Sequence, residues 1–387
     1  MSMTLFERAF RPFFLAAGVF SMFAMGLWMA FSRSWIVPPR STLGAVQWHA
    51  HEMLFGYAMA VIAGFLLTAI HNWTGIRTLF GPALAVLLGV WITARIALLI
   101  PGIDLQWVAA FDLGFGVLLV AATCWPLIKA GNFKQLAVIS KLLLLVGANL
   151  AFYLGTLHAD ARSVHIGLYA GLYLELSLVL MISRRVLPGF IERSVATPFV
   201  ARNRKWLDIS VLALFLVFML AELFFNQPLF TAFVAAILFV LHSLRLHGWY
   251  TREIWSVPLV WVLVLAYAFI ILGFALAALV PLRSALALLA LHAFAVGGIG
   301  MMTLGMMLRV SLGHTGRNVL APPPGLWPVC ALIAISALLR VLVPALLPEH
   351  YAMWIVLSQA AWILAFAWLV GLLTPLLLRP RVDGKHG

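Results

Sequence analysis

The chain is organised around the stretch WHAHEMLFGY at residues 48–57, which opens an apolar span that closes at HNWTG, residues 71–75. Ionisable groups at membrane depth are costly unless they are paired or bound, so two histidines and a glutamate at the mouth of such a span indicate a site. A second span runs from His292 to His314. In both spans, His49 to His71 and His292 to His314, the two histidines are 22 residues apart. On a regular helix this is about 33 Å, the thickness of a bilayer core, and the two side chains return to within about 40° of one face.

Composition places the protein in a membrane. Of 387 residues, 64% are hydrophobic and 10% are charged, and the mean hydropathy is +1.08. No soluble fold buries that much apolar surface, so we expect an all-α, polytopic membrane protein with a single integral domain over residues 1–387. The net charge of +13 would suggest nucleic acid in a soluble protein, but here lipid is the expected partner and nucleic acid is not. The two cysteines form no Cys-x-x-Cys-His motif for covalent haem.

Twelve apolar segments are long enough to cross a bilayer. They cover residues 13–31, 49–71, 82–100, 107–128, 136–157, 163–183, 206–225, 228–246, 257–280, 284–308, 326–347 and 352–378. Pro or Gly marks most of the turns, and several connections are so short that neighbouring spans must be antiparallel. We therefore predict a bundle of about twelve transmembrane helices.

The basic residues predict the orientation. If the N-terminus is cytoplasmic, nineteen Lys and Arg residues lie on the inner side and four on the outer side. The inner tail includes Lys385, and the outer loops hold Arg33, Arg40, Arg162 and Arg283. This bias follows the positive-inside rule, so both termini are expected to be cytoplasmic. The inner loop 184–205 alternates basic and apolar residues and is expected to lie along the membrane surface.

This orientation divides the candidate histidines into two groups. The outer group is His49, His51 and His292, the last about 12 Å deep if its helix starts near residue 284. The inner group is His71, His314 and His242. Neutral imidazole is a common ligand of haem iron and copper, so all six are candidate metal ligands. We expect a non-covalent, b-type haem, with copper as a second candidate.

Glycines beside these histidines have two interpretations. The run AFAVGGIG at residues 293–300 follows His292, and Gly56 follows His51. Such small residues admit either a macrocycle or a closely packed helix, and membrane bundles use them widely for packing. Beside a deep histidine we favour the cofactor.

The pair His51-Glu52 also has two interpretations. Glu52 could cap the first helical turn while His51 lies in interfacial water. Alternatively, one histidine ligates a metal while Glu52 orients a ligand or relays protons, which makes Glu52 the candidate catalytic residue. On a regular helix His49 and His51 diverge by about 200°, so they can bind one ion together only if the helix begins after them.

Further candidates lie near the inner side and within the spans. His71 and His314 could be solvated loop residues or a second cofactor site. Arg184 and Arg185 could neutralise haem propionates or anchor the chain by the positive-inside rule. The acidic residues within spans, each a candidate for a proton path or a structural ion pair, are Asp112, Glu175 and Glu222; Arg95 is a candidate partner of Asp112.

Several of these motifs resemble the NnrS family. They are WHAHEMLFG at 48–56, GFLLTA at 64–69 with NWTG at 72–75, GHTGR at 313–317 and FRPFF at 10–14. The resemblance implies a haem- and copper-containing protein of the bacterial inner membrane that is linked to nitric oxide metabolism and nitrosative stress. The family motifs cover His49, His51, Glu52, His71, His292 and His314. In one departure, PLVW at 258–261 is not followed by the histidine that the family often has there, which puts copper at that place in doubt.

Three functions are compatible with this pattern. The first is a haem protein that binds nitric oxide and reduces or detoxifies it, taking electrons from a quinol or a cytochrome. It is similar to the haem–copper oxidase subunit and nitric oxide reductases in having twelve helices and key histidines on helices two and ten, an analogy at the level of the fold. The second is a bis-histidine electron-transfer cytochrome. The third is a transporter of metal or haem.

Overall fold

The computed structural model describes residues 2–38, 43–225 and 227–384, and every regular element in these ranges is a helix. Twelve helical segments are long and apolar enough to cross a membrane, which confirms the predicted number. They are α2 (Phe10–Ser32), α3–η1–α4 (Ala45–His51, Glu52–Ala58, Met59–Thr74), α5 (Gly81–Leu99), α6 (Leu105–Lys129), η2–α7 (Phe133–Gln135, Leu136–Leu157), α8 (Ala161–Ser194), α9 (Lys205–Phe224), α10 (Pro228–Trp249), α11 (Pro258–Ala278), α12–η4–α13 (Leu286–His292, Ala293–Gly300, Met301–His314), α14 (Leu326–Leu346) and η5–α15 (Pro348–His350, Tyr351–Leu378). The short helices α1 (Ser2–Leu5) and η3 (Arg252–Ser256) lie outside the spans. Arg40 and Lys385, which entered the orientation argument, lie outside the described residues.

One segment differs from its prediction. Residues 184–194, expected as part of a loop on the membrane surface, continue α8 as a regular helix. The helix persists because Leu187 and Ile191, one turn apart, are both buried, so this end of α8 keeps an apolar contact face. Arg184 and Arg185 are therefore helical residues, and only residues 195–204 form the connection to α9.

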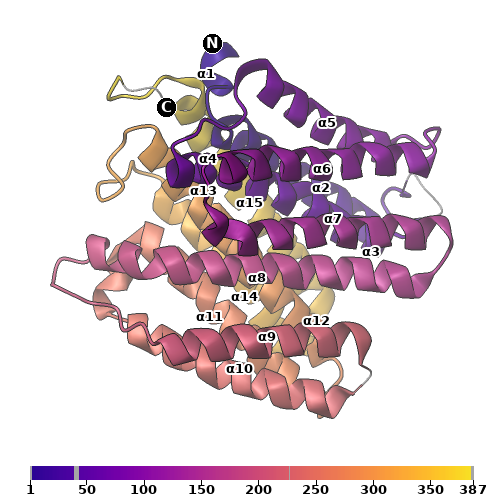
Figure 1. Cartoon of the computed structure of the whole chain (residues 1–387). Helices are drawn as coiled ribbons and strands as arrows, with labels where there is room; N and C mark the ends of the chain where they lie inside the picture. The colour runs from indigo at the N-terminus through magenta and orange to yellow at the C-terminus, as the bar shows by residue number, and fades with distance from the viewer. Residues whose placement is uncertain (1, 39–42, 226, 385–387) are drawn as a thin grey trace. The chain divides into compact units, whose positions relative to one another are not determined.

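The contacts divide the chain into two compact units. Unit 1 comprises residues 1–175, 310–318 and 366–387, and unit 2 comprises residues 176–309 and 319–365. In unit 1, Arg11 joins the two ends of the chain, because its Nη1 donates to the carbonyls of Leu377 (2.7 Å) and Arg379 (2.8 Å). The segments near the two ends of the described chain accordingly lie close together (Figure 1).

Unit 2 is built around α11, in which 15 of the 21 residues are buried and none is exposed. The glycines of η4 face large side chains: a Cβ on Gly297 would lie 2.4 Å from Phe269, and one on Gly300 would lie 2.5 Å from Trp362. These glycines thus allow close helix packing, and protein side chains fill the space beside them. The packing interpretation of the glycine run therefore describes the structure.

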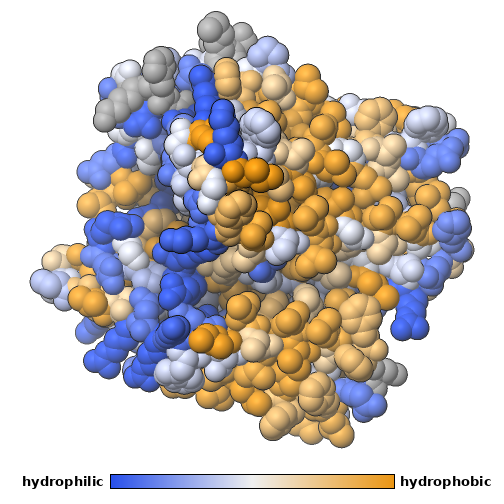
Figure 2. All heavy atoms as spheres, viewed as in Figure 1, coloured by the Kyte–Doolittle hydropathy of each residue, from blue (hydrophilic) through white to orange (hydrophobic). Residues whose placement is uncertain are grey.

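The helix surfaces match a lipid environment. Along helices that face the viewer in Figure 2, hydrophobic side chains cover the middle and hydrophilic side chains gather towards the ends. Exposed Phe111, Leu118 and Trp125 on α6, for example, have apolar side chains that a soluble protein would bury. This pattern agrees with twelve membrane spans.

Candidate functional site

Two stretches of π-helix follow two of the candidate histidines. The π-helix η1 begins directly after His51, and η4 begins directly after His292. Each extra residue in a π-turn rotates the rest of the helix by about 100°, and such turns are frequent at functional sites. We expected the two histidines of each span to face the same way because we assumed a regular helix. The π-turns break that regularity, so the assumption does not hold.

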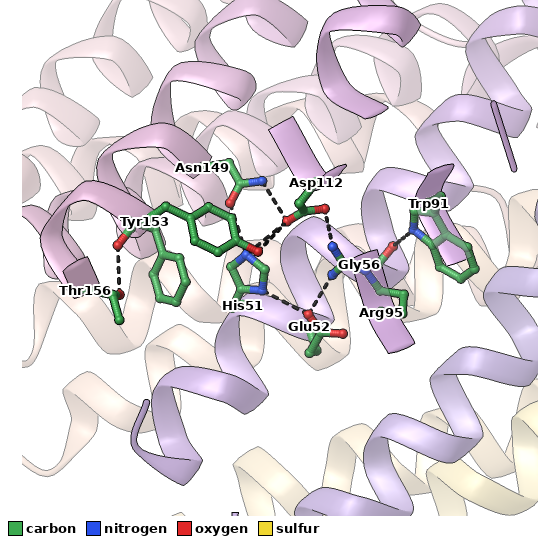
Figure 3. A network of polar contacts seen from close by, with 10 residues as sticks. His51, Glu52, Gly56, Trp91, Arg95, Asp112, Asn149, Tyr153 and Thr156 are labelled. Atoms are coloured by element: carbon green, nitrogen blue, oxygen red, sulfur yellow. Dashed lines mark hydrogen bonds and ion pairs between the residues drawn. The ribbon is translucent and has the colours of Figure 1, made fainter. Parts of the chain in front are cut away.

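His51 lies at the centre of a buried polar network in unit 1 (Figure 3). His51 is 0% exposed, so the interpretation of this residue as lying in interfacial water is wrong. Glu52 is 1% exposed and follows α3, which begins at Ala45, so it does not cap the first helical turn. The Nδ1 of His51 is 2.9 Å from Glu52 Oε1. Its Nε2 is 3.0 Å from Asn149 Oδ1 and 3.3 Å from Asp112 Oδ2.

Four separate segments contribute to this network. Arg95 of α5 donates to Glu52 Oε1 (2.6 Å) and also to Asp112 Oδ1 of α6. From α7, Asn149 Nδ2 and the Tyr153 hydroxyl each donate to Asp112 Oδ2 at 3.0 Å. The pairing of Arg95 with Asp112, raised from the sequence, is present. No pattern in the sequence pointed to Asn149 or Tyr153, because polar side chains within membrane spans also hydrogen-bond between helices in ordinary packing.

The polarity of the hydrogen bonds determines the protonation of His51. Because Asn149 donates its amide nitrogen to Asp112, its amide oxygen is the atom that faces His51 Nε2. Both ring nitrogens of His51 therefore face acceptor oxygens, and both must carry hydrogen. The network then holds two positive groups, His51 and Arg95, against the two carboxylates, so its net charge is zero. An imidazolium has no lone pair, so this arrangement does not fit His51 as a metal ligand.

Gly56 and Trp91 hold the helices around this network. A Cβ on Gly56 would lie 2.7 Å from the Phe20 ring and 3.0 Å from Arg95 Nη1, so only glycine leaves room for the guanidinium. The indole of Trp91 on α5 donates to the Gly56 carbonyl within the π-helix η1 (3.0 Å). The local irregularity and the ion network thus support each other.

His49 points away from this network. Both histidines belong to α3, which begins at Ala45, so they diverge as a regular helix requires. The His49 ring stacks on Trp28 of α2, with centroids 4.5 Å apart and planes at 10°. His49 and His51 consequently cannot hold one ion together.

His71 lines a cavity of about 860 Å³ in unit 1. The N-terminal segment 6–9 forms one wall of this cavity, and residues 77–82 form another. The Nδ1 of His71 donates to the Ile76 carbonyl (3.1 Å), so in the neutral ring Nε2 keeps the lone pair. His314 is close enough to His71 to interact with it electrostatically, and its ring lies 5.5 Å from that of Phe10.

Basic groups gather at this cavity. Arg8 and Arg77 are both in its lining, and Arg77 lies over the Phe80 ring, 3.6 Å from its centre. Burial, followed by the charges of Arg381 and Arg77, holds the pKa of Arg8 below its ordinary value, while Glu7 opposes the shift. Like charges brought together in this way favour a bound anion.

The remaining predicted residues lie in unit 2. His292 donates Nδ1 to the Leu288 carbonyl (2.8 Å), and its Nε2 accepts from Arg340 (2.9 Å), so a metal there would have to displace a guanidinium. His242 is fully buried, with Nδ1 2.6 Å from the Tyr267 hydroxyl. Arg184 pairs with Asp208 (2.6 Å), and Arg185 is exposed.

Comparison with known families matches residues 4–381 to the family described as NnrS protein. The chain belongs to the NnrS protein family. The match covers nearly the whole chain and includes all of the motifs that carried the resemblance in the sequence. A search of the curated proteins found no match. In the part of this NnrS-family protein that the structure describes, no three His, Cys, Asp or Glu side chains are grouped as a metal site would need.

Proposed function

We propose that this NnrS-family protein binds nitric oxide in the membrane and reduces or detoxifies it, with a b-type haem held by His71. Membership of the family supports the link to nitric oxide. We place the haem beside His71 because this histidine lines a large cavity. The bacterial inner membrane is the location that the family and the basic helix ends favour.

The cavity residues fit a haem in three respects. The contact with the Ile76 carbonyl orients His71 and leaves Nε2 able to bind iron. Arg8 and Arg77 match the two propionates in charge. Most of the other lining residues are apolar, which keeps water from the ring. Bound there, a haem would supply an iron centre that binds nitric oxide and accepts electrons from a quinol or cytochrome.

The other predicted ligands fit a haem less well. His51 is held as an imidazolium between Glu52 and Asn149, and Arg340 occupies the Nε2 of His292. Arg184 neutralises Asp208 and is not left for a propionate. Among the described side chains, no three His, Cys, Asp or Glu residues are grouped to hold copper. Glu52 stays a candidate proton-handling residue, as a member of the neutral ion network.

The test is the absorption spectrum of the purified protein, reduced and oxidised, with and without nitric oxide. We expect a haem signal that shifts with nitric oxide and is lost in His71→Ala. The matched control is His158→Ala, because His158 is an exposed histidine at the end of α7. Full haem content in His71→Ala would show that His71 does not hold the haem. Loss of haem in His292→Ala or His49→Ala would then assign it to the histidine that was replaced. A haem signal indifferent to nitric oxide would favour the electron-transfer cytochrome.

A further inference from the structure

The motif HNWTG at residues 71–75 forms the turn that ends α4 beside the cavity of unit 1. Thr74 is the last helical residue, and Gly75 follows with a φ of +71°, a left-handed conformation that glycine adopts without strain. The Gly75 N–H donates to the His71 carbonyl (2.8 Å). This bend brings the carbonyl of Ile76 beside the ring of His71, where it accepts from Nδ1 (3.1 Å).

The hydroxyl of Thr74 connects the end of α4 to this turn. It donates to the Ile70 carbonyl (2.7 Å) and accepts from the Ile76 N–H (3.1 Å). A hydroxyl carries one hydrogen and two lone pairs, so both hydrogen bonds form at the same time. Ile76 is thus held through its N–H by Thr74 while its carbonyl accepts from His71.

Two further side chains fix the turn to its surroundings. Thr78 Oγ1 donates to the Leu67 carbonyl on α4 (2.8 Å), and Asn132 Nδ2 donates to the Trp73 carbonyl (3.2 Å). Asn132 lies in the connection between α6 and η2. The chain is therefore anchored on both sides of Ile76, which limits the freedom of its carbonyl.

Stabilising the end of α4 does not require all of these contacts. Gly75 already ends the helix, and a threonine hydroxyl that bonds the carbonyl four residues back adds little to helix stability. The bond from the Ile76 N–H to Thr74 has another effect, because it fixes the residue whose carbonyl meets His71. In water a neutral histidine carries its hydrogen mainly on Nε2, whereas an accepting carbonyl at Nδ1 requires the hydrogen there. An acceptor that is held in place supplies this preference.

We propose that Thr74 is a positioning residue for His71. By holding the Ile76 carbonyl, its hydroxyl keeps the hydrogen of the neutral imidazole on Nδ1 and leaves the lone pair of Nε2 for a ligand in the cavity. The identity of that ligand as haem iron rests on the proposed function, whereas the choice of ring nitrogen does not. Groups that orient a metal-binding histidine through its other nitrogen change metal affinity by about 10- to 100-fold.

The experiment locates the imidazole hydrogen by nitrogen-15 NMR of histidine-labelled, haem-free, full-length protein in lipid at about pH 9, where imidazole is neutral. The wild-type protein should show the hydrogen on Nδ1 of His71, with His71→Gln identifying the signal. In Thr74→Val, which removes the hydroxyl at nearly constant volume, the ratio of Nδ1–H to Nε2–H should fall about fivefold, the factor that one hydrogen bond supplies. Thr74→Ser, which keeps the hydroxyl, should restore the wild-type ratio.

The matched control is Thr374→Val on α15. Thr374 also donates to the carbonyl four residues back, at 2.7 Å from Val370, and it is half-buried like Thr74, but it is not part of the turn. This variant removes the same chemical group and should leave the ratio at His71 unchanged.

Three results would overturn the proposal: a wild-type His71 with its hydrogen on Nε2, an unchanged ratio in Thr74→Val, or a ratio in Thr74→Ser as low as in Thr74→Val. Circular dichroism and thermal unfolding establish that each variant is folded, and Thr74→Ala removes the same hydroxyl if Thr74→Val does not fold. Titration with haem is a separate measurement, in which Thr74→Val should bind about tenfold more weakly than the wild type. A wild-type protein that binds no haem would refute the proposed function alone, because the hydrogen is located without haem.

Discussion

Replacing Arg95 by methionine tests the buried ion network directly. Arg95 makes two charged hydrogen bonds, one to Glu52 and one to Asp112, and both carboxylates are almost fully buried. A hydrogen bond to a charged group contributes about 1.5–3 kcal/mol, and removal of one partner of a buried ion pair costs about 3–5 kcal/mol. We therefore expect Arg95→Met to lower the free energy of unfolding by about 3–5 kcal/mol.

The assay is unfolding of the purified protein in mixed micelles with increasing SDS, followed by circular dichroism. The control is Lys134→Met, which removes one positive charge from an exposed position and should change stability by less than about 0.5 kcal/mol. Adding Asp112→Asn to Arg95→Met restores a net charge of zero, so the double variant should be more stable than the sum of the single changes predicts. A loss below about 1 kcal/mol in Arg95→Met, or strict additivity, would refute the reasoning.

Two further predictions concern packing and pH. Gly297→Ala should destabilise unit 2 by about 1–3 kcal/mol in the same assay, because the new Cβ would overlap the Phe269 ring, whereas Gly114→Ala, with open space beside it, should not. Hydrogen bonds from the side chain and backbone of Thr197 hold the pKa of Glu253 below its ordinary value. The ionised carboxylate therefore accepts these hydrogen bonds at neutral pH, and the stability they contribute is lost as pH falls through the lower, folded-state pKa. The hydrogen of the Thr197 amide should therefore exchange faster in Glu253→Gln than in the wild type at pH 7, and the two rates should become equal in acid. A difference in rate that persisted in acid would show that the ionised carboxylate does not hold the Thr197 amide.

The sequence was sufficient for the membrane class and for the helix count. Hydropathy sums over neighbouring residues, so it locates a span without knowledge of what the span packs against. The end of α8 shows the limit of this approach. Residues 184–194 look polar enough for a loop, but the buried faces of Leu187 and Ile191 keep them helical. Packing with other parts of the chain decided that boundary.

The candidate site was predicted only in part. The motif at residues 48–57 marked His51 and Glu52 correctly as unusual, and the family motifs were found from the sequence alone. The partners Asn149 and Tyr153 come from a helix about 100 residues further along the chain, and no local pattern distinguishes them. The cavity at His71 depends in the same way on the N-terminal segment that forms one of its walls.

The sequence by itself thus determined the composition of each span, the side of the membrane that its basic residues favour and the family of the chain. Only the tertiary structure decided which atoms face each histidine. The physical reason is that a hydrogen bond depends on the rotation of two helices to within a fraction of a turn. The π-turns after His51 and His292 each shift that rotation by about 100°, so a 3.6-residue period extrapolated through them gives the wrong face.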